Sequence, residues 1–226
     1  MQLADKVAVI TGAARGLGRA YAEALAAEGA AIVAADLNDC SDTVAAVESA
    51  GGRAVSSTVN VSDAASCEAM ASLAMDAFGR VDVLINNAAL YAGLKGARFE
   101  RLDEEQWDRV MQVNIKGTWL TSRAVVDHMR ASGGGSIINI ASLAAVFGLP
   151  YGLDYVASKA AVIGMTRGMA RELGADHIRV NAVAPSAVMT EGTEEFFGEK
   201  FEKAKAVIAS NQLIPRNLET EDLTGT

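Results

Sequence analysis

Short runs of β-branched residues alternate along this chain with longer Ala-, Leu- and Glu-rich stretches of helical period. Because each run is almost continuously apolar, both faces of each strand should be covered, which is typical of a parallel sheet. The alternation predicts an α/β fold: a doubly wound parallel sheet with helices on both faces, formed by a single domain over residues 1–226. The expected strands are Val7–Ile10, Ala31–Ala35, Ala54–Val59, Val81–Ile85, Ser136–Ile140 and Ile178–Ala182.

The stretches between these runs predict helices, several of which have a recognisable start. Ser62 is a plausible N-cap for the third helix. The fourth opens with Asp103-x-x-Gln106, which has the spacing of a capping box. The expected helices are Arg19–Glu28, Ser41–Ala50, Asp63–Phe78, Asp103 to about Arg130, and Asp154–Leu173.

Composition and charge exclude several classes of function. The 20 Lys and Arg against 28 Asp and Glu give a net charge of −8, so binding to nucleic acid or to an anionic membrane is not expected. The chain lacks the roughly 18 consecutive apolar residues of a membrane span. Cys40 and Cys67 cannot form a disulfide framework and no secretory signal is recognisable, which favours a cytoplasmic protein. His128 and His177 fit no metal-ligand spacing, so no metal is expected.

A glycine-rich turn, TGAARGLG over Thr11–Gly18, joins the first strand to the first helix. Glycines allow a pyrophosphate to approach closely, and a helix N-terminus offers it free N–H groups. Asp36 closes the second strand, where a carboxylate can bind the adenosine ribose and repel a 2′-phosphate; an ordinary strand-end turn is the alternative. NAD is therefore favoured over NADP, although Arg15 beside the turn could favour NADP. The cofactor residues expected here are Gly12, Arg15, Gly16, Leu17, Gly18 and Asp36.

Tyr155 and Lys159 are four residues apart and therefore share one face of an expected helix. Ser142 follows the fifth strand, and ligands of an open α/β sheet bind at the carboxyl ends of its strands. A surface Tyr–Lys pair without function is the alternative. An ammonium ~4 Å from the phenol would contribute about 4 kcal/mol at an effective dielectric constant of ~20, which would lower the pKa of Tyr155 from ~10 toward ~7.

These segments together resemble the motif set of the short-chain dehydrogenase/reductase family, from Lys6 to about Thr190. The resemblance implies a Rossmann-type sheet and NAD(P)-dependent interconversion of alcohols and ketones. It implies that Ser142 bonds the substrate oxygen, that Tyr155 is the acid/base, and that Lys159 holds the nicotinamide ribose and helps to ionise Tyr155. Asn114 would support a water path to Lys159. The matching motifs are Thr11–Gly18, Asn86-Asn87-Ala88-Ala89, Asn114, Ser142, Tyr155-x-x-x-Lys159, Pro185 and Thr190.

The same resemblance implies further contacts with the cofactor. Asn60 and Val61 match an adenine-contacting Asp-Val pair, in which the Asn carbonyl can still accept from the adenine amino group. Asn87 matches a residue near the adenosine-side ribose, whereas Val188 and Thr190 match contacts to the nicotinamide carboxamide. The residues implied on this ground are Asn60, Val61, Asn87, Tyr155, Lys159, Pro185, Val188 and Thr190.

Three loops after strand ends should frame the substrate pocket: Leu90–Lys95, Leu143–Leu153 and Ser186–Thr193. Their side chains are largely apolar, and the last two contain no Arg or Lys, which favours an apolar substrate; packing within the loops is the alternative. Residues of about 186–212 should form a mobile lid. A helix resembling Glu219–Thr226 would lead, in the family, into a last strand that is missing here.

The leading hypothesis is an NAD-dependent oxidoreductase that transfers a hydride between NAD(H) and a small, mostly apolar secondary alcohol or ketone. One alternative is a 3-oxoacyl-thioester reductase, an activity that usually uses NADP. Another is a non-catalytic NAD-binding protein, which would be expected to lack one of Ser142, Tyr155 and Lys159; all three are present. The expected partners are a small-molecule substrate and further copies of the chain, as a dimer or homotetramer.

Overall fold

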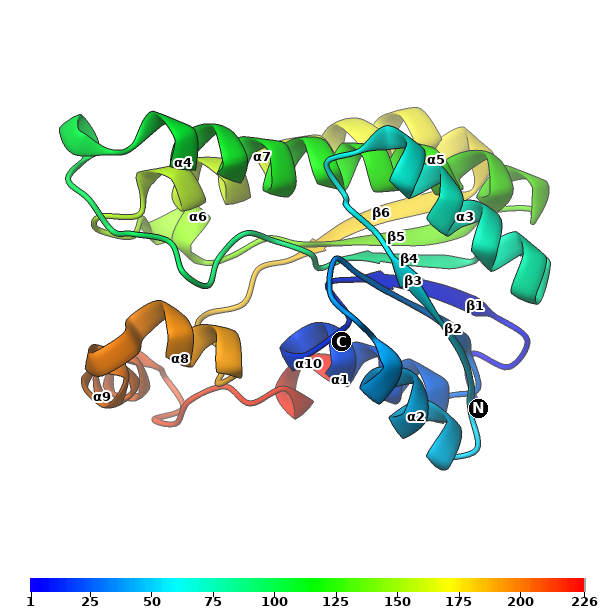
Figure 1. Cartoon of the computed structure of the whole chain (residues 1–226), viewed down its shortest axis with the longest axis horizontal. Helices are drawn as coiled ribbons and strands as arrows, with labels where there is room; N and C mark the ends of the chain where they lie inside the picture. Colours follow the sequence, from blue (N-terminus) through cyan, green and yellow to red (C-terminus); the bar gives the residue numbers. More distant parts are fainter. Residues whose placement is uncertain (226) are drawn as a thin grey trace.

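Six parallel strands form one sheet in the order β3-β2-β1-β4-β5-β6 (Figure 1). The computed structural model describes residues 1–225. Strand order reverses between β1 and β4, which is where ligands bind in sheets of this kind. The doubly wound parallel sheet predicted from the alternation is confirmed. The strands are β1 Val7–Thr11, β2 Ala31–Asp36, β3 Arg53–Thr58, β4 Val83–Asn86, β5 Gly135–Ile140 and β6 Ile178–Val183.

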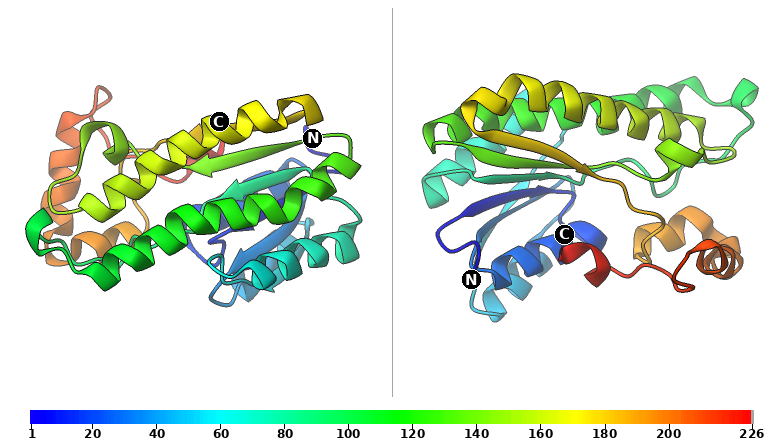
Figure 2. Two further views of the ribbon diagram at one scale, coloured as in Figure 1. Left: turned by 90° about the horizontal axis from the view of Figure 1, so that it is seen from above. Right: turned by 180° about the vertical axis from the view of Figure 1, so that it is seen from behind.

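Helices cover both faces of the sheet. Figures 1 and 2 show α3, α5 and α7 along one face, with α1 and α2 against the other. The short helix α10 lies beside α1 within the stretch expected to be helical at Glu219–Thr226, of which residue 226 lies outside the described part. The helices are α1 Gly16–Ala27, α2 Ser41–Ser49, α3 Ala64–Phe78, α4 Glu104–Val110, α5 Thr118–Ala131, α6 Ala144–Phe147, α7 Leu153–Leu173, α8 Glu191–Phe197, α9 Phe201–Asn211 and α10 Glu221–Thr224.

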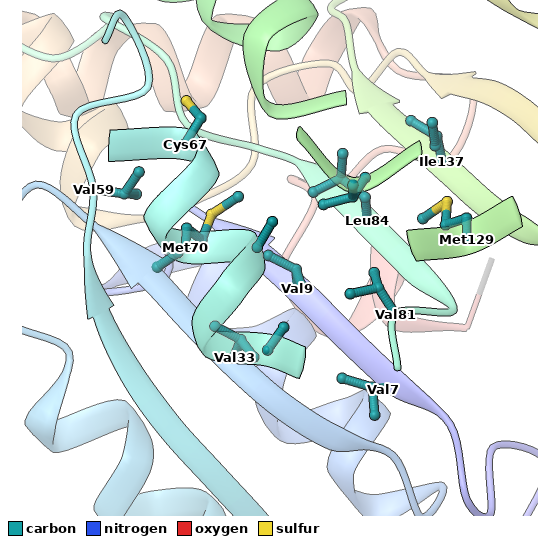
Figure 3. Close-up of a cluster of buried hydrophobic side chains, with 14 of the residues drawn as sticks. Val7, Val9, Val33, Val59, Cys67, Met70, Val81, Leu84, Met129 and Ile137 are labelled. Atoms are coloured by element: carbon teal, nitrogen blue, oxygen red, sulfur yellow. The ribbon is translucent and has the colours of Figure 1, made fainter. Parts of the chain in front are cut away.

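The core consists of two apolar clusters, one on each face of the sheet. Val7 and Val9 of β1 belong to one of these clusters together with Met70 of α3 (Figure 3). Ala8 and Ile10, the alternate residues of the same strand, belong to the cluster on the other face. Because successive side chains of a strand point to opposite faces, an uninterrupted apolar run serves both clusters.

Two expected helix starts differ in the structure. The N-cap of α3 is Asp63, whose carboxylate accepts from the Ala65 N–H at 3.1 Å. Ser62 does not cap the helix because its hydroxyl donates to Asn60 Oδ1 at 2.7 Å. The second difference concerns α1, which begins at Gly16 rather than at the expected Arg19. The last residues of the glycine turn therefore form the first turn of the helix.

The long helix expected from Asp103 is built from three consecutive segments. A π-helical stretch, Met111–Gly117, separates α4 from α5. Asp103 accepts from the Gln106 N–H at 2.7 Å, so this half of the capping box is present. The other half is replaced: the Gln106 side chain bonds both backbone groups of Lys95 and the buried carboxylate of Asp154. Gln106 therefore ties α4 to the start of α7.

The segment expected to form a lid contains α8 and α9, which lie to one side of the sheet, near the N-terminal start of α1 (Figure 1). An isolated parallel bridge between Val188 and Leu218 pairs the stretch before α8 with the stretch after α9. Within residues 1–225, no helix combines the length and the hydropathy needed to cross a membrane.

Candidate active site

The candidate site lies where β1, β4 and β5 end. The Thr11 hydroxyl accepts from the backbone N–H groups of Asn87 and Ala88, both at 3.1 Å, and donates to the Ile85 carbonyl at 3.3 Å. Since Thr11 ends β1 and Ile85 belongs to β4, these bonds hold together the two strands at which the strand order reverses.

The glycine turn packs closely against the segment after β4. A Cβ on Gly18 would lie 2.0 Å from the Gly12 carbonyl oxygen, so only glycine fits there. The Asn87 side chain donates to the carbonyls of Thr11 and Gly12, both at 3.0 Å. Asn87 therefore shapes the turn in this structure, whereas its expected contact with a ribose remains a prediction.

The start of α1 suits an anionic ligand. Gly16 has a φ of +55°, and a Cβ there would approach only Thr190 and Glu191, at 3.5 Å or more. Arg15 makes no side-chain capping bond and the first turn has no acidic residue, so the N–H groups of this turn can bind a pyrophosphate. A cavity of about 530 Å³, partly lined by Gly16 and Thr190, opens beside it. The residues present thus fit a dinucleotide; Leu17, on the same turn, is half-buried against the core.

Asp36 stands at the end of β2, next to the glycine turn. Its carboxylate accepts from the Ala14 N–H at 3.1 Å and from the Asn38 N–H at 2.9 Å. It is half-buried, so part of the carboxylate can meet a ligand. Asp36 is thus held beside the glycine turn, and its expected contact with a ribose remains a prediction.

Arg15 forms a two-bonded salt bridge with Glu195 of α8, with Arg15 Nη2 2.9 Å from Glu195 Oε2. The pKa of Arg15 is raised mainly by this hydrogen bond, with smaller contributions from the charges of Glu191 and Asp36. Sequence reasoning did not anticipate Glu195, and no local signal could have pointed to it, because the two residues are 180 positions apart.

Asn60 and Val61 follow β3, at the far end of the expected nucleotide site. The Asn60 side-chain carbonyl accepts from the Ser62 N–H at 3.1 Å as well as from the Ser62 hydroxyl. The oxygen expected to meet an adenine is therefore already engaged within the loop. Val61 is buried in the core, and contact of either residue with a cofactor remains a prediction.

Ser142 and Tyr155 are brought together at the end of β5. Ser142 follows the strand, its hydroxyl accepting from the Ala144 N–H at 3.1 Å. Tyr155 lies in the first turn of α7, where Asp154 accepts from its N–H at 2.8 Å. Burial raises the pKa of Tyr155, and a hydrogen bond with Ser142 offsets part of that rise.

Lys159 lies one turn further along α7 and is buried. Its ammonium donates to the Ile140 carbonyl at 2.7 Å and lies 5.8 Å from the centre of the Tyr155 ring. Burial lowers the pKa of Lys159 to about 8. The expected fall in the pKa of Tyr155 is thus wrong for this structure, because desolvation of the phenolate dominates and the group that opposes it is the Ser142 hydroxyl rather than the ammonium of Lys159.

Asn114 lies in the π-helical stretch, completely buried. Its side chain accepts from the Leu90 N–H at 2.7 Å and donates to the Leu90 carbonyl and to the Ser158 hydroxyl. These contacts fix the loop after β4 against α7. Single π-helical turns are frequent at functional sites, but the expected water path from Asn114 to Lys159 remains a prediction.

A buried network of polar side chains, which sequence reasoning missed, aligns β4 and β5. Asn86 donates to Asn139 Oδ1 at 2.9 Å, and Asn139 donates to Thr166 of α7 at 2.9 Å. Asn86 also bonds Thr121 and Ser122 of α5. The available signal was an asparagine within each of two apolar runs, since a buried amide needs hydrogen-bond partners.

The lid reaches Tyr155 through stacked rings. The ring of Phe196 stacks on that of Tyr91, with centroids 4.5 Å apart, and Tyr91 contacts Tyr155 with centroids 5.2 Å apart. Burial raises the pKa of Tyr91 to about 12. The loop after β4, which is expected to frame the pocket, and the expected lid therefore meet beside Tyr155.

The segment after β6 leads from the sheet to α8. The Pro185 carbonyl accepts from the Leu143 N–H at 2.9 Å, which holds this segment against the loop after β5. Val188 is buried, and its carbonyl accepts from the Thr193 hydroxyl at 2.6 Å. Thr190 is the N-cap of α8. Whether Pro185, Val188 and Thr190 contact a nicotinamide remains a prediction.

The comparisons with known proteins agree with this geometry. Residues 6–200 match the model of the short chain dehydrogenase family. The chain belongs to this family. The dehydrogenase is 39% identical, over 86% of its length and 79% of the relative's, to the 3-oxoacyl-[acyl-carrier-protein] reductase of Thermotoga maritima. It is 36% identical, over 93% of its length and 82% of the relative's, to the NAD-dependent glycerol dehydrogenase of Listeria innocua. The crystal structure of levodione reductase superposes with a TM-score of 0.92 at 32% identity, covering 99% of this chain and 89% of that one.

Proposed function

We propose that this dehydrogenase transfers a hydride between NAD(H) and a small, mostly apolar secondary alcohol or ketone. The proposal rests on one observation: Ser142, Tyr155 and the buried Lys159 converge at the end of β5, at the edge of the sheet where the glycine turn begins. A non-catalytic nucleotide-binding protein would have no use for a buried ammonium beside a phenol.

Each side chain has a defined part in this chemistry. Ser142 would donate a hydrogen bond to the oxygen of the substrate, and Tyr155 would take the hydroxyl proton of an alcohol or return it to a ketone. Lys159 would favour the phenolate during that transfer. NAD, when bound along α1, supplies the hydride acceptor and, once reduced, the hydride donor. In oxidation the alcohol thus loses one proton to Tyr155 and one hydride to the cofactor.

NAD is proposed over NADP because of the charges around the adenosine side. Asp36 at the end of β2 would accept from the ribose hydroxyls and repel a 2′-phosphate. The guanidinium of Arg15, which could have attracted that phosphate, is paired with Glu195. The similarity to an NAD-dependent glycerol dehydrogenase supports the same choice.

An apolar substrate is proposed from the loop after β5. Val146 and Phe147 of α6 and Tyr151 beyond it are 63%, 81% and 64% exposed, so apolar surface lies close to Ser142. Reduction of 3-oxoacyl thioesters is the second candidate, favoured by the similarity to the Thermotoga maritima enzyme.

A substrate panel tests these proposals. Alkyl and aryl secondary alcohols, polyols and 3-oxoacyl thioesters would be supplied with NAD(H) or NADP(H), and the absorbance of the reduced nicotinamide followed. We expect turnover of the carbinols with NAD. Turnover confined to the thioesters, or faster turnover with NADP, would replace the leading proposal by the second. Cofactor binding without turnover of any substrate would favour the alternative of a non-catalytic NAD-binding protein.

We also propose a homo-oligomer, a dimer or tetramer, that acts in the cytoplasm. Both cysteines are free and buried, as suits a protein of a reducing compartment. Light scattering of the purified protein across a range of concentrations measures the assembly directly; a mass equal to that of one chain at all of them would contradict the oligomer.

A further inference from the structure

One ion pair connects the glycine turn to the lid. Arg15, the last residue before α1, is bonded through two nitrogens to both carboxylate oxygens of Glu195. The N–H donors of a guanidinium have fixed directions in one plane. The edge of the Arg15 guanidinium that carries Nη1 and Nη2 donates to both oxygens of Glu195. The paired side of the guanidinium is therefore not available to another anion.

The position of the pair matters because of what surrounds it. Arg15 lies close enough to Asp36 and Glu191 for their charges to stabilise its own charge. Asp36 is the carboxylate proposed to bind the adenosine ribose. A phosphate on the 2′-hydroxyl of that ribose would thus arrive beside Arg15 and between carboxylates, and would need a free guanidinium to balance them.

We propose that Glu195 is a cofactor-specificity residue, which excludes 2′-phosphorylated dinucleotides by occupying the guanidinium of Arg15. This inference rests on the proposed function, since it assumes that a dinucleotide binds along α1 with its ribose at Asp36. It extends that proposal by assigning the choice of cofactor to two carboxylates, one at the end of β2 and one on the lid.

The expected size of the effect follows from exposure. The side chains of Arg15 and Glu195 are 51% and 48% exposed, and exposed ion pairs are weak because water and salt screen them. Removing the charge of Glu195 should therefore improve the affinity for NADP by about two- to fivefold. Affinity for NAD, which carries no 2′-phosphate, should change by less than about twofold.

The experiment measures equilibrium dissociation constants of NAD and NADP by titration calorimetry, without substrate or turnover. The variants are E195Q, R15Q and the double variant R15Q/E195Q. The matched control is E194Q, which removes an equal charge from the adjacent exposed position of α8. We expect E195Q to lower the Kd ratio of NADP to NAD, E194Q to leave it unchanged, and E195Q to have no effect in the R15Q background.

Each contrary result has a defined meaning. An unchanged ratio in E195Q, an equal change in E194Q, or a change that persists without Arg15 would overturn the role of Glu195 while leaving the NAD proposal intact. Equal weakening of both nucleotides in E195Q would also overturn it, because Glu195 would then serve only to close the lid. Failure of the unmodified protein to bind either nucleotide would refute the proposed function and this inference together. Melting curves of the four variants, all at exposed positions, verify that they are folded.

Discussion

Burial acts in opposite senses on the two ionisable residues of the site. It raises the pKa of Tyr155 and lowers the pKa of Lys159 to about 8, because a desolvated site disfavours whichever form is charged. At neutral pH the phenol therefore holds its proton, ready to be given to a ketone. Oxidation of an alcohol needs that proton removed first, so its rate should increase as the pH rises.

Replacing Tyr155 by Phe removes the hydroxyl and keeps the ring. We expect turnover to fall by at least about 100-fold, the size of a general acid/base contribution, while the Kd for NAD stays nearly unchanged. Initial rates and nucleotide titrations on the same preparation measure both. A Phe variant that retains most of the rate would refute the role of Tyr155.

Replacing Lys159 by Met tests the depressed pKa through stability. Between pH 8 and 10.5 the unfolded chain keeps this lysine protonated while the folded chain releases the proton, so the unfolded state binds more protons and the free energy of unfolding rises with pH. Relative to K159M, the unmodified protein should gain about 3 kcal/mol across that window, at about 1.4 kcal/mol per pKa unit. Urea unfolding at several pH values measures the gain. Parallel profiles for the two proteins would contradict the depressed pKa.

At the scale of elements, the decisive contact is that of the first turn of α1 with the turn that follows β1. The helix starts inside the glycine turn, and Gly18 approaches the Gly12 carbonyl without room for a side chain. The same packing that brings the helix N-terminus to the end of β1 thus leaves its first N–H groups free for a ligand.

Replacing Gly18 by Ala should therefore be destabilising, although alanine is the better helix former. The added Cβ would meet the Gly12 oxygen at 2.0 Å, and we expect a loss of about 1–3 kcal/mol with weaker NAD binding. The matched control is Gly164→Ala in α7, where the Cβ meets nothing within 4 Å and a gain of up to about 1 kcal/mol is expected. Thermal melts and nucleotide titrations measure the contrast; two variants of equal stability would show that the turn can relax.

At the scale of the whole molecule, the lid is tied to the sheet domain at several separate places. Glu195 pairs with Arg15 and Phe196 stacks on Tyr91, while a bridge between Val188 and Leu218 pairs the stretches that lead into and out of the lid. These contacts lie at both the nucleotide end and the tyrosine end of the site. Because α9 contains no buried residue, the lid has little apolar core of its own.

We therefore expect the lid, the sheet and the helices that cover it to unfold in one cooperative transition. Far-ultraviolet circular dichroism reports on all helices, whereas fluorescence reports on Trp107 in α4 and Trp119 in α5. The two denaturation curves should coincide, as for other two-state domains. An earlier fluorescence transition would instead show that this helical layer unfolds separately.

Local spacing in the chain was enough to predict the strands, the parallel sheet, the glycine turn and the shared face of Tyr155 and Lys159. These features depend on residues within a few positions of one another, because side chains repeat on the same face every two residues in a strand and every three to four in a helix. The N-cap of α3 was mispredicted at the same range, because Ser62 had a competing partner in Asn60.

The pairing of Arg15 with Glu195, the stacking of Phe196 on Tyr91 and the rise in the pKa of Tyr155 came only from the folded arrangement. Each depends on which distant segments meet and on how much water they exclude. No periodicity records such contacts, since side chains 180 positions apart become neighbours only when the helical layers close over the sheet. The order of the motifs thus identified the family, and the packing of the lid determined which charges surround the glycine turn.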